Sequence, residues 1–268
     1  MSTTPESQKT LRALRIDFGV ILAIIFCSIP IILHWHVRPM ISAIFFYVLP
    51  TVYLFLRGGR KPIRRIIYGA ALIGIGFGFI FDIILSANRA WIELPSQLVF
   101  PYYIFGFWPI DEPIWFFLWA LFIIVFYEHF FDRETRGRIS KRFRYIAFPV
   151  TIALFAIMAA FMNQQSSFHI PYAYFFLAFP SIIPVIYVME ERPELALKFL
   201  KTAVFFFMLY LVYEITAVKL GQWYFPGEYV GWVELGNLRF PFEELFFWMT
   251  LSSFTVLSLY EGFVDDGR

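Results

Sequence analysis

The chain contains little cysteine, little charge and little histidine. Cys27 is its single cysteine, which excludes an internal disulfide and any metal site built from several cysteines. Charged residues make up 16% of the 268 residues, and the formal net charge is only +2. So small a charge gives no reason to expect a nucleic acid partner.

The signatures of several enzyme classes are also missing. The sequence has no phosphate-cradling loop, no Ser/His/Asp signature and no DDxxD-type cluster for a metal and a diphosphate. The stretch GIGFGF (Gly74 to Phe79) lies inside an apolar run with no strand before it, so we interpret it as a close-packing helix face rather than a nucleotide site. His34 and His36 flank Trp35 at an expected membrane interface, where they are predicted to anchor rather than to bind metal. We therefore expect no metal and no cofactor.

Hydrophobic residues dominate what is present. They account for 60% of the chain, which includes 36 phenylalanines, and the mean hydropathy is +0.67. Eight apolar runs are long enough to cross about 30 Å of hydrocarbon at about 1.5 Å per helical residue. The sequence therefore predicts an all-α integral membrane protein with about eight transmembrane helices. We expect these helices at 18–34, 40–56, 66–86, 113–131, 146–162, 171–189, 202–218 and 242–260.

The distribution of lysine and arginine orients the predicted helices. If the N-terminus lies inside, the inner segments hold 18 of the 22 basic residues and the outer segments hold 4. Because cytoplasmic loops carry an excess of basic residues, both termini are expected in the cytoplasm, with these residues near lipid headgroups. The first apolar run lacks a small-residue cleavage site, so we expect it to remain as a helix of a multi-pass cell-membrane protein.

When the sequence is shifted by 132 residues, its first half aligns with its second half. It carries WPIDEPIWFF, which begins at Trp108, onto FPFEELFFWM, which begins at Phe240. In both stretches, an acidic pair precedes a run of aromatic residues. The other aligned positions also share their chemistry. The shift pairs Asp82 with Glu214, Trp91 with Trp223, Asp111 with Glu243 and Glu112 with Glu244.

This internal similarity predicts the organisation of the chain. We expect one membrane domain, 1–268, made of a repeat at 16–132 and a second at 145–264. Because each repeat crosses the membrane four times, both copies point the same way, as parallel repeats related by an axis along the membrane normal. Both acidic motifs then lie on the outer side.

Carboxylates inside the apolar runs are the leading candidates for function. An acid in the membrane is costly unless it faces a protein interior, a partner or water, so Asp82 and Glu214 are functional candidates. The acidic pairs that begin two helices are less decisive on their own. A carboxylate in a first helical turn also complements the helix dipole, so a purely structural capping role stays open for each motif taken alone.

One member of each acidic pair is expected to face inward, because adjacent helical residues point about 100° apart. We favour Glu112, which shares a helix face with Trp115 and Phe116. By the same argument Glu244 faces inward with the aromatic residues one turn later, Phe247 and Trp248. Glu128 and Glu261, near the inner ends of the fourth and eighth helices, are instead expected to be solvated interface residues.

Two pairs of blocks carry a resemblance to a known family. They are DIILSANRAW with PIDEPIWFF, and EITAVKLGQW with PFEELFF. Together they resemble the tandem lycopene cyclase domain of small integral-membrane carotenoid cyclases, which occur as heterodimers or fused units, and the similarity covers nearly the whole chain. The second copy fits that family's Pro-x-Glu-Glu helix start at Pro241, Glu243 and Glu244, whereas the first has Asp111 for the first Glu and Pro113 directly after the pair.

The resemblance implies a reaction and a substrate class. A lycopene-type cyclase protonates a terminal alkene, closes a six-membered ring through a tertiary cation, and loses a proton elsewhere without net redox change. Its partner is a hydrophobic carotenoid or polyprenoid in the lipid bilayer, and no cofactor is implied. The sequence leaves open the ring type, the exact carotenoid, whether one or both ends are cyclised, and whether the protein forms a homo-oligomer.

The residues suit that chemistry. The proton donor must be an acid that stays neutral, which burial and a neighbouring carboxylate both favour, and Glu244 is the preferred candidate. Aromatic faces can shield and stabilise the cation. The predicted acid/base residues are Glu112, Glu244, Asp82 and Glu214, with Asp111 and Glu243 as the other members of the two pairs. The predicted substrate-binding and cation-stabilising residues are Trp91, Trp108, Trp115, Phe116, Trp223, Phe247 and Trp248.

Several alternatives remain open from the sequence. A related enzyme could hydrate the carotenoid end, or cyclise another polyprenoid, with the same acids and aromatic residues. Parallel repeats and intramembrane acids also suit proton-coupled transport. A structural or partner-binding membrane protein would tolerate neutral replacements of all six acids.

Overall fold

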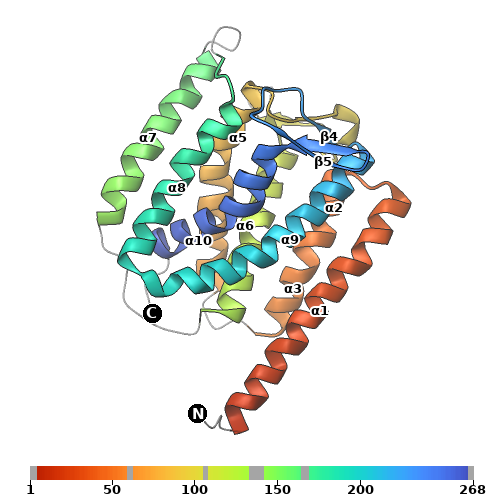
Figure 1. The fold of residues 1–268 in the computed structure, drawn as a ribbon, viewed down its shortest axis with the longest axis vertical. Coiled ribbons are helices and arrows are strands. Elements are labelled where there is room, and N and C mark those ends of the chain that lie inside the picture. The colour runs from red at the N-terminus through yellow and green to blue at the C-terminus, as the bar shows by residue number, and fades with distance from the viewer. Residues whose placement is uncertain (1–4, 59–62, 105–107, 133–141, 164–168, 265–268) are drawn as a thin grey trace.

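Helices that run alternately up and down build the protein (Figure 1). The computed structural model describes residues 5–58, 63–104, 108–132, 142–163 and 169–264. Within these residues, six helical segments are long and apolar enough to cross a membrane. The fold is therefore all-α and membrane-embedded. The six segments are Leu11–Trp35, Pro39–Leu56, Ile63–Ala87, Asp111–Phe130, Ala173–Glu191 and Pro193–Leu220.

The helices of the first half include two that contain a π-helical stretch. One π segment follows α2 and the other follows α4, and each continues directly into the next α-helix. The elements are α1 (Pro5–Trp35), α2 (Pro39–Ala43), η1 (Ile44–Val48), α3 (Leu49–Leu56), α4 (Ile63–Ala70), η2 (Ala71–Phe77), α5 (Gly78–Ala87) and α6 (Asp111–Phe130).

The second half supplies the remaining helices. The predicted segments 146–162 and 242–260 coincide with α7 and with the continuous pair η5 and α10, which are helical but are not among the six spans. The elements are α7 (Arg142–Asn163), α8 (Ala173–Glu191), η4 (Pro193–Leu195), α9 (Ala196–Leu220), the π-helix η5 (Glu244–Leu251) and α10 (Ser252–Phe263).

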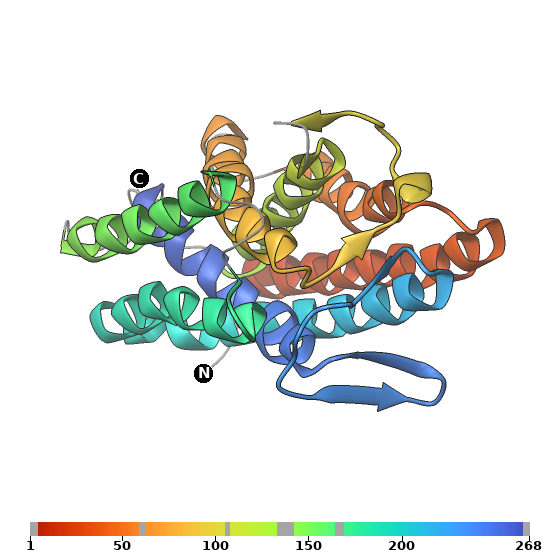
Figure 2. The same cartoon turned by 90° about the horizontal axis from the view of Figure 1, so that it is seen from above.

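Short strands gather at one end of the helices, which we call the strand end, opposite the terminal end where α1 begins (Figure 1). They form antiparallel pairs: β1 with β4, β2 with β3, and β5 with β6. Seen from above, the β5–β6 hairpin projects beyond the helices (Figure 2). The elements are β1 (Ile92–Glu93), η3 (Pro95–Gln97), β2 (Tyr103–Ile104), β3 (Trp108–Pro109), β4 (Trp223–Tyr224), β5 (Trp232–Leu235) and β6 (Leu238–Pro241).

The glycines of GIGFGF bring η2 and α5 close to α6. A Cβ added to Gly74 would lie 2.4 Å from the carbonyl oxygen of Phe116, and one added to Gly78 would lie 3.1 Å from the Phe116 ring. At Gly74 only glycine permits this approach, whereas Gly76 has no neighbour within 4 Å, so the predicted close packing is confirmed at Gly74 and Gly78. The contact fixes the first turns of α6, where the first acidic pair lies.

The terminal end corrects one expectation. Glu128 and Glu261 are buried, with 4% and 7% of their surfaces exposed, rather than solvated. Tyr260 donates a 2.6 Å hydrogen bond to Glu128, and Tyr127 donates one of 2.6 Å to Glu261. The two crossed bonds join α6 to α10 and satisfy carboxylate oxygens that would otherwise be costly to bury. Apolar neighbours along these helices do not reveal such a partner on another helix.

Candidate functional site

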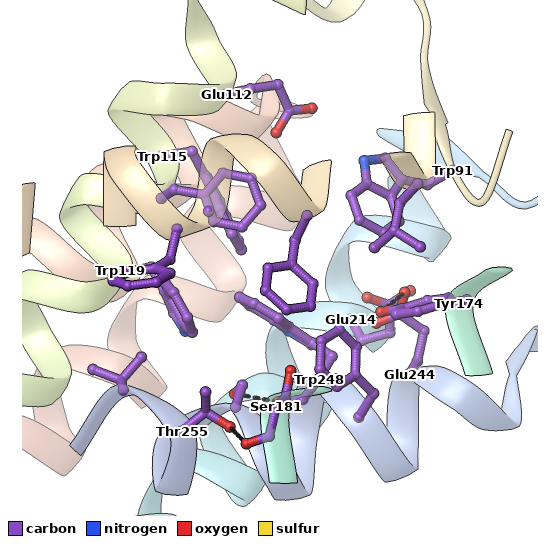
Figure 3. A pocket seen from close by; sticks show the side chains of 18 of the residues that line it. Trp91, Glu112, Trp115, Trp119, Tyr174, Ser181, Glu214, Glu244, Trp248 and Thr255 are labelled. Carbon is purple, nitrogen blue, oxygen red and sulfur yellow. Dashed lines mark hydrogen bonds between the residues drawn. The ribbon is translucent and has the colours of Figure 1, made fainter. Parts of the chain in front are cut away.

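A cavity of about 1060 Å³ opens between the two halves and extends from the strand end into the helices. Most of its lining is apolar and aromatic, with three carboxylates from the expected set, Glu112, Glu214 and Glu244. Figure 3 shows Glu112 beside Trp115, and Glu214 and Glu244 apart from it, near Tyr174. We call this space the main cavity.

Glu112 enters the main cavity from the first turn of α6. A carboxylate at this position complements the helix dipole, and Pro113 is tolerated because the first-turn N–H groups have no partner within the helix. Trp91, which precedes β1, turns its indole nitrogen toward Glu112 (Figure 3) and hydrogen-bonds it. The electrostatic neighbours of Glu112 include Asp82 and Glu93. Glu112 is therefore the inward member of its pair, as expected.

Glu244 enters the cavity from the first turn of η5. Tyr174 of α8 donates a 2.9 Å hydrogen bond to its Oε1, and Glu214 of α9 is one of its electrostatic neighbours. Trp223 in β4 donates a 3.1 Å bond to Glu214. Figure 3 shows Tyr174, Glu214 and Glu244 gathered at one side of the cavity. The second half therefore supplies a tyrosine-bonded acid beside a tryptophan-bonded acid.

Asp82 lies behind the cavity wall rather than in it. Its side chain is fully buried, and it accepts a hydrogen bond from the indole of Trp108 and one of 3.2 Å from Ser86. Trp108 packs on Phe79, with ring centroids 4.6 Å apart. Neither Asp82 nor Trp108 lines the main cavity, so the predicted placement of Trp108 in the cavity wall is wrong, and Asp82 acts on the cavity only as an electrostatic neighbour of Glu112.

The other two members of the acidic pairs hold loop backbone. Asp111 accepts hydrogen bonds of 2.7 and 3.0 Å from the backbone N–H groups of Val99 and Phe100. Glu243 accepts one of 2.6 Å from the backbone N–H of Val230. Neither acid lines the main cavity. These bonds fix the loops of the strand end above the helices.

Aromatic rings form much of the cavity wall. Trp248 packs against Trp115 and Trp119, with ring centroids 5.0 and 4.9 Å away. Trp115 donates a 2.9 Å hydrogen bond to Tyr213, which keeps its indole ring in place. Six of the seven expected aromatic residues line the cavity. They are Trp91, Trp115, Phe116, Trp223, Phe247 and Trp248.

Glu93 was not among the expected acids. It lies in β1, paired opposite Trp223 of β4, and lines the main cavity. Its Oε2 is buried with no hydrogen-bond partner among the described residues. Burial, and then the nearby charges of Asp111 and Asp82, raise the pKa of Glu93 to about 8.

Tyr174, Tyr213 and Trp119 were also missed. All three line the cavity, and Tyr213 has charged neighbours from both halves, Glu93, Glu112 and Glu214. One signal available in the sequence was the position of Tyr213 directly before Glu214. Tyr174 and Trp119 sit in apolar runs with no nearby acid in the sequence, so nothing distinguished them from core residues.

This arrangement suits acid/base chemistry on an apolar molecule. Carboxyls surrounded by hydrocarbon and by one another favour the protonated form, so they can donate protons. Facing aromatic rings can stabilise a cation and exclude water. Few polar groups are present to bind a polar substrate. No protein-family model, curated protein or solved structure matches this chain.

Proposed function

We propose that the protein is a membrane cyclase of the lycopene cyclase type, acting on a linear carotenoid or related polyprenoid. The observation that carries the proposal is that Glu112 and Glu244, one from each half, line the same aromatic, apolar cavity. The resemblance of the two acidic blocks to the tandem lycopene cyclase domain agrees with this chemistry. The substrate arrives from the bilayer, and the reaction needs no redox cofactor.

The reaction is an isomerisation. A carboxyl gives its proton to the terminal alkene, which forms one C–H bond and a tertiary cation. The next alkene attacks the cation and closes a six-membered ring through a new C–C bond. An ionised carboxylate then removes a proton beside the new cation, which restores an alkene. The base releases this proton to water, and the donor takes up a new proton from water, so the site returns to its starting state.

Glu244 is the preferred proton donor. Tyr174 bonds its Oε1 at 2.9 Å and stabilises the carboxylate that remains after the proton has left. Glu214 is an electrostatic neighbour of Glu244 in the same cavity, and Trp115 and Trp248 supply aromatic rings for the developing cation. Each ring contributes very roughly 0.5–2 kcal/mol to stabilising that charge.

The proposal includes two parallel four-helix repeats, 16–132 and 145–264, within an eight-helix protein. Strands β1 and β4 support it, because Ile92 pairs opposite Tyr224, the residue 132 positions later. An antiparallel pair in which a residue faces its own equivalent has a local two-fold axis at that point. Asp111 and Glu243, also 132 apart, both hold loop backbone.

The π-helix η5 accounts for a one-residue change in this spacing. Tyr127 and Glu128 match Tyr260 and Glu261 at a shift of 133, and the crossed bonds Tyr127 to Glu261 and Tyr260 to Glu128 have two-fold character. A π turn accommodates one residue more than an α turn. The π-helix η5 begins at Glu244, whereas the matching part of α6 is a regular α-helix. The extra residue therefore lies between Glu244 at the strand end and Glu261 at the terminal end.

We propose the cell membrane as the location, with both termini in the cytoplasm. Basic residues at the terminal end support this orientation, because Arg57 ends α3, Arg64 and Arg65 begin α4, and Lys198 and Lys201 begin α9. A cytoplasm-active reporter fused to the C-terminus should be active. A reporter that functions only outside the cell should be silent at the same position.

Expression in a lycopene-accumulating bacterium tests the activity. Chromatography and mass spectrometry should show a ring-containing product with the same mass as lycopene. A product heavier by one water would favour the hydratase alternative. Unaltered lycopene, with the protein present in the membrane, would contradict the proposed activity and leave transport as the next hypothesis to test in proteoliposomes.

A further inference from the structure

A second cavity adjoins the main one and is here called the side pocket. It has a volume of about 420 Å³ and lies between α5, α7, α8 and α10. The two cavities share five lining residues, so the two spaces adjoin at these side chains. The shared residues are Phe77, Phe81, Ser181, Thr255 and Leu259.

The side pocket is suited to an apolar ligand. Its lining contains no charged residue. Ser181 donates to the carbonyl of Leu177 at 3.3 Å, and Thr255 donates to the carbonyl of Ser181 at 3.1 Å. The hydroxyls of these two residues already have acceptors within the protein, so they do not require a polar ligand. Hydrocarbon is therefore the chemistry that fits this space.

The pocket reaches the surface that faces lipid. Val150 of α7 and Ile183 and Pro184 of α8 line it and are partly exposed. Next to them Ile152 and Ile186 are 54% and 52% exposed on the same two helices. The pocket therefore lies between the outer faces of α7 and α8 and the main cavity.

The corresponding place in the first half is filled. A shift of 133 residues aligns Phe122 with Thr255 and Phe126 with Leu259. Phe126 stacks on Phe205 with ring centroids 4.2 Å apart. Both Phe122 and Phe126 are almost fully buried. These rings occupy the volume that the smaller side chains leave open in the second half.

We propose that the side pocket holds the hydrocarbon chain of the substrate while its terminal alkene lies in the main cavity. This inference rests on the proposed function and adds the path of the substrate. The chain leaves the protein sideways, between α7 and α8, into the lipid. A long linear polyprenoid therefore binds by one end at a time, and a second ring requires release and rebinding in the opposite direction.

Filling the side pocket tests the inference. Leu154→Trp adds bulk at a buried lining position, and Ile183→Trp adds it at a partly exposed one, so the second variant remains informative if the first does not fold. Ile152→Trp, on the lipid-facing side of α7, is the matched control. Each is expressed in lycopene-accumulating cells, with its amount in the membrane and its thermal midpoint in detergent measured alongside ring formation.

The inference predicts at least a tenfold slower ring formation in Leu154→Trp or Ile183→Trp at matched protein amount and thermal midpoint, with Ile152→Trp close to wild type. Wild-type rates in every folded pocket-filling variant would mean that the side pocket holds a lipid acyl chain or nothing, and would overturn the inference while leaving the cyclase proposal intact. No ring formation by the wild-type protein would overturn the function and, with it, this path.

Discussion

Two layers of buried acids invite comparison. At the strand end, Glu112 and Glu244 face the main cavity. At the terminal end, Asp17, Glu128 and Glu261 are equally buried, with 2–7% of their surfaces exposed, yet none lines the main cavity or the side pocket.

The terminal-end acids are held by partners of the protein itself. Asp17 accepts bonds of 2.7 Å from Tyr53 and 2.7 Å from Arg57, and the two glutamates accept their tyrosine bonds. Glu112 and Glu244 at the strand end also accept hydrogen bonds, from Trp91 and Tyr174, but both face the main cavity as well. The difference teaches that burial and residue type do not separate the two layers, whereas access to an apolar cavity does.

Neutralising one acid in each layer should give the largest contrast. Glu244→Gln keeps the shape of the side chain but cannot give a proton, so ring formation should fall about 100- to 10,000-fold. Glu261→Gln, at the terminal end, should leave the rate of ring formation unchanged. Pigment chromatography at matched membrane levels measures both. Equal losses of ring formation in the two variants would contradict the proposed difference between strand-end and terminal-end acids.

Removing the tyrosine donor of each layer should give a smaller contrast. Tyr174→Phe deletes the hydroxyl that stabilises the Glu244 carboxylate, and we expect about a 3- to 20-fold slower reaction, from about 0.6–1.7 kcal/mol for a hydrogen bond in a membrane.

The matched change at the terminal end is Tyr127→Phe, which removes the 2.6 Å bond to Glu261. It should lower the thermal midpoint in detergent and leave the rate per folded molecule unchanged. If Tyr174→Phe lowered only the thermal midpoint, Tyr174 would have a structural role alone.

The smallest expected effect concerns Glu93, which lies in a strand-end loop. Its pKa is raised to about 8 in the folded protein from an ordinary 4.5. Between these values the folded protein binds more protons than the unfolded chain, so stability falls as the pH rises. Glu93→Gln should therefore reduce the fall in thermal midpoint between about pH 5 and about pH 8.

The control for Glu93 is Glu234→Gln, because the side chain of Glu234 is 73% exposed in β5. This variant should retain the wild-type pH dependence of the thermal midpoint. An unchanged pH dependence in Glu93→Gln would show that Glu93 titrates near its ordinary pKa and does not share the strand-end environment.

Much of the helical arrangement follows from the sequence, because apolar runs and glycine spacing act locally. The inward orientation of Glu112 and Glu244 was also predictable, since aromatic residues one turn later share their helix face. The expected eight helices were predicted from length alone, and six of them meet the criteria for a membrane span within the described residues.

The remaining site residues depend on contacts between distant segments. Glu93 has Phe225 at the matching position of the second half, so a search for duplicated acids passes over it. Tyr174 reaches Glu244 from another helix, 70 positions away in sequence. The burial of Glu128 and Glu261 likewise depends on tyrosines 132 and 134 positions away.

Isotope incorporation tests the central claim most directly. Membranes that contain the protein are incubated with lycopene in D₂O, and the ring-containing product is analysed by mass spectrometry. Proton-initiated cyclisation predicts an isomer of lycopene that carries one deuterium for each ring formed, and no such product with Glu244→Gln. A ring-containing product without deuterium from the solvent would contradict the account.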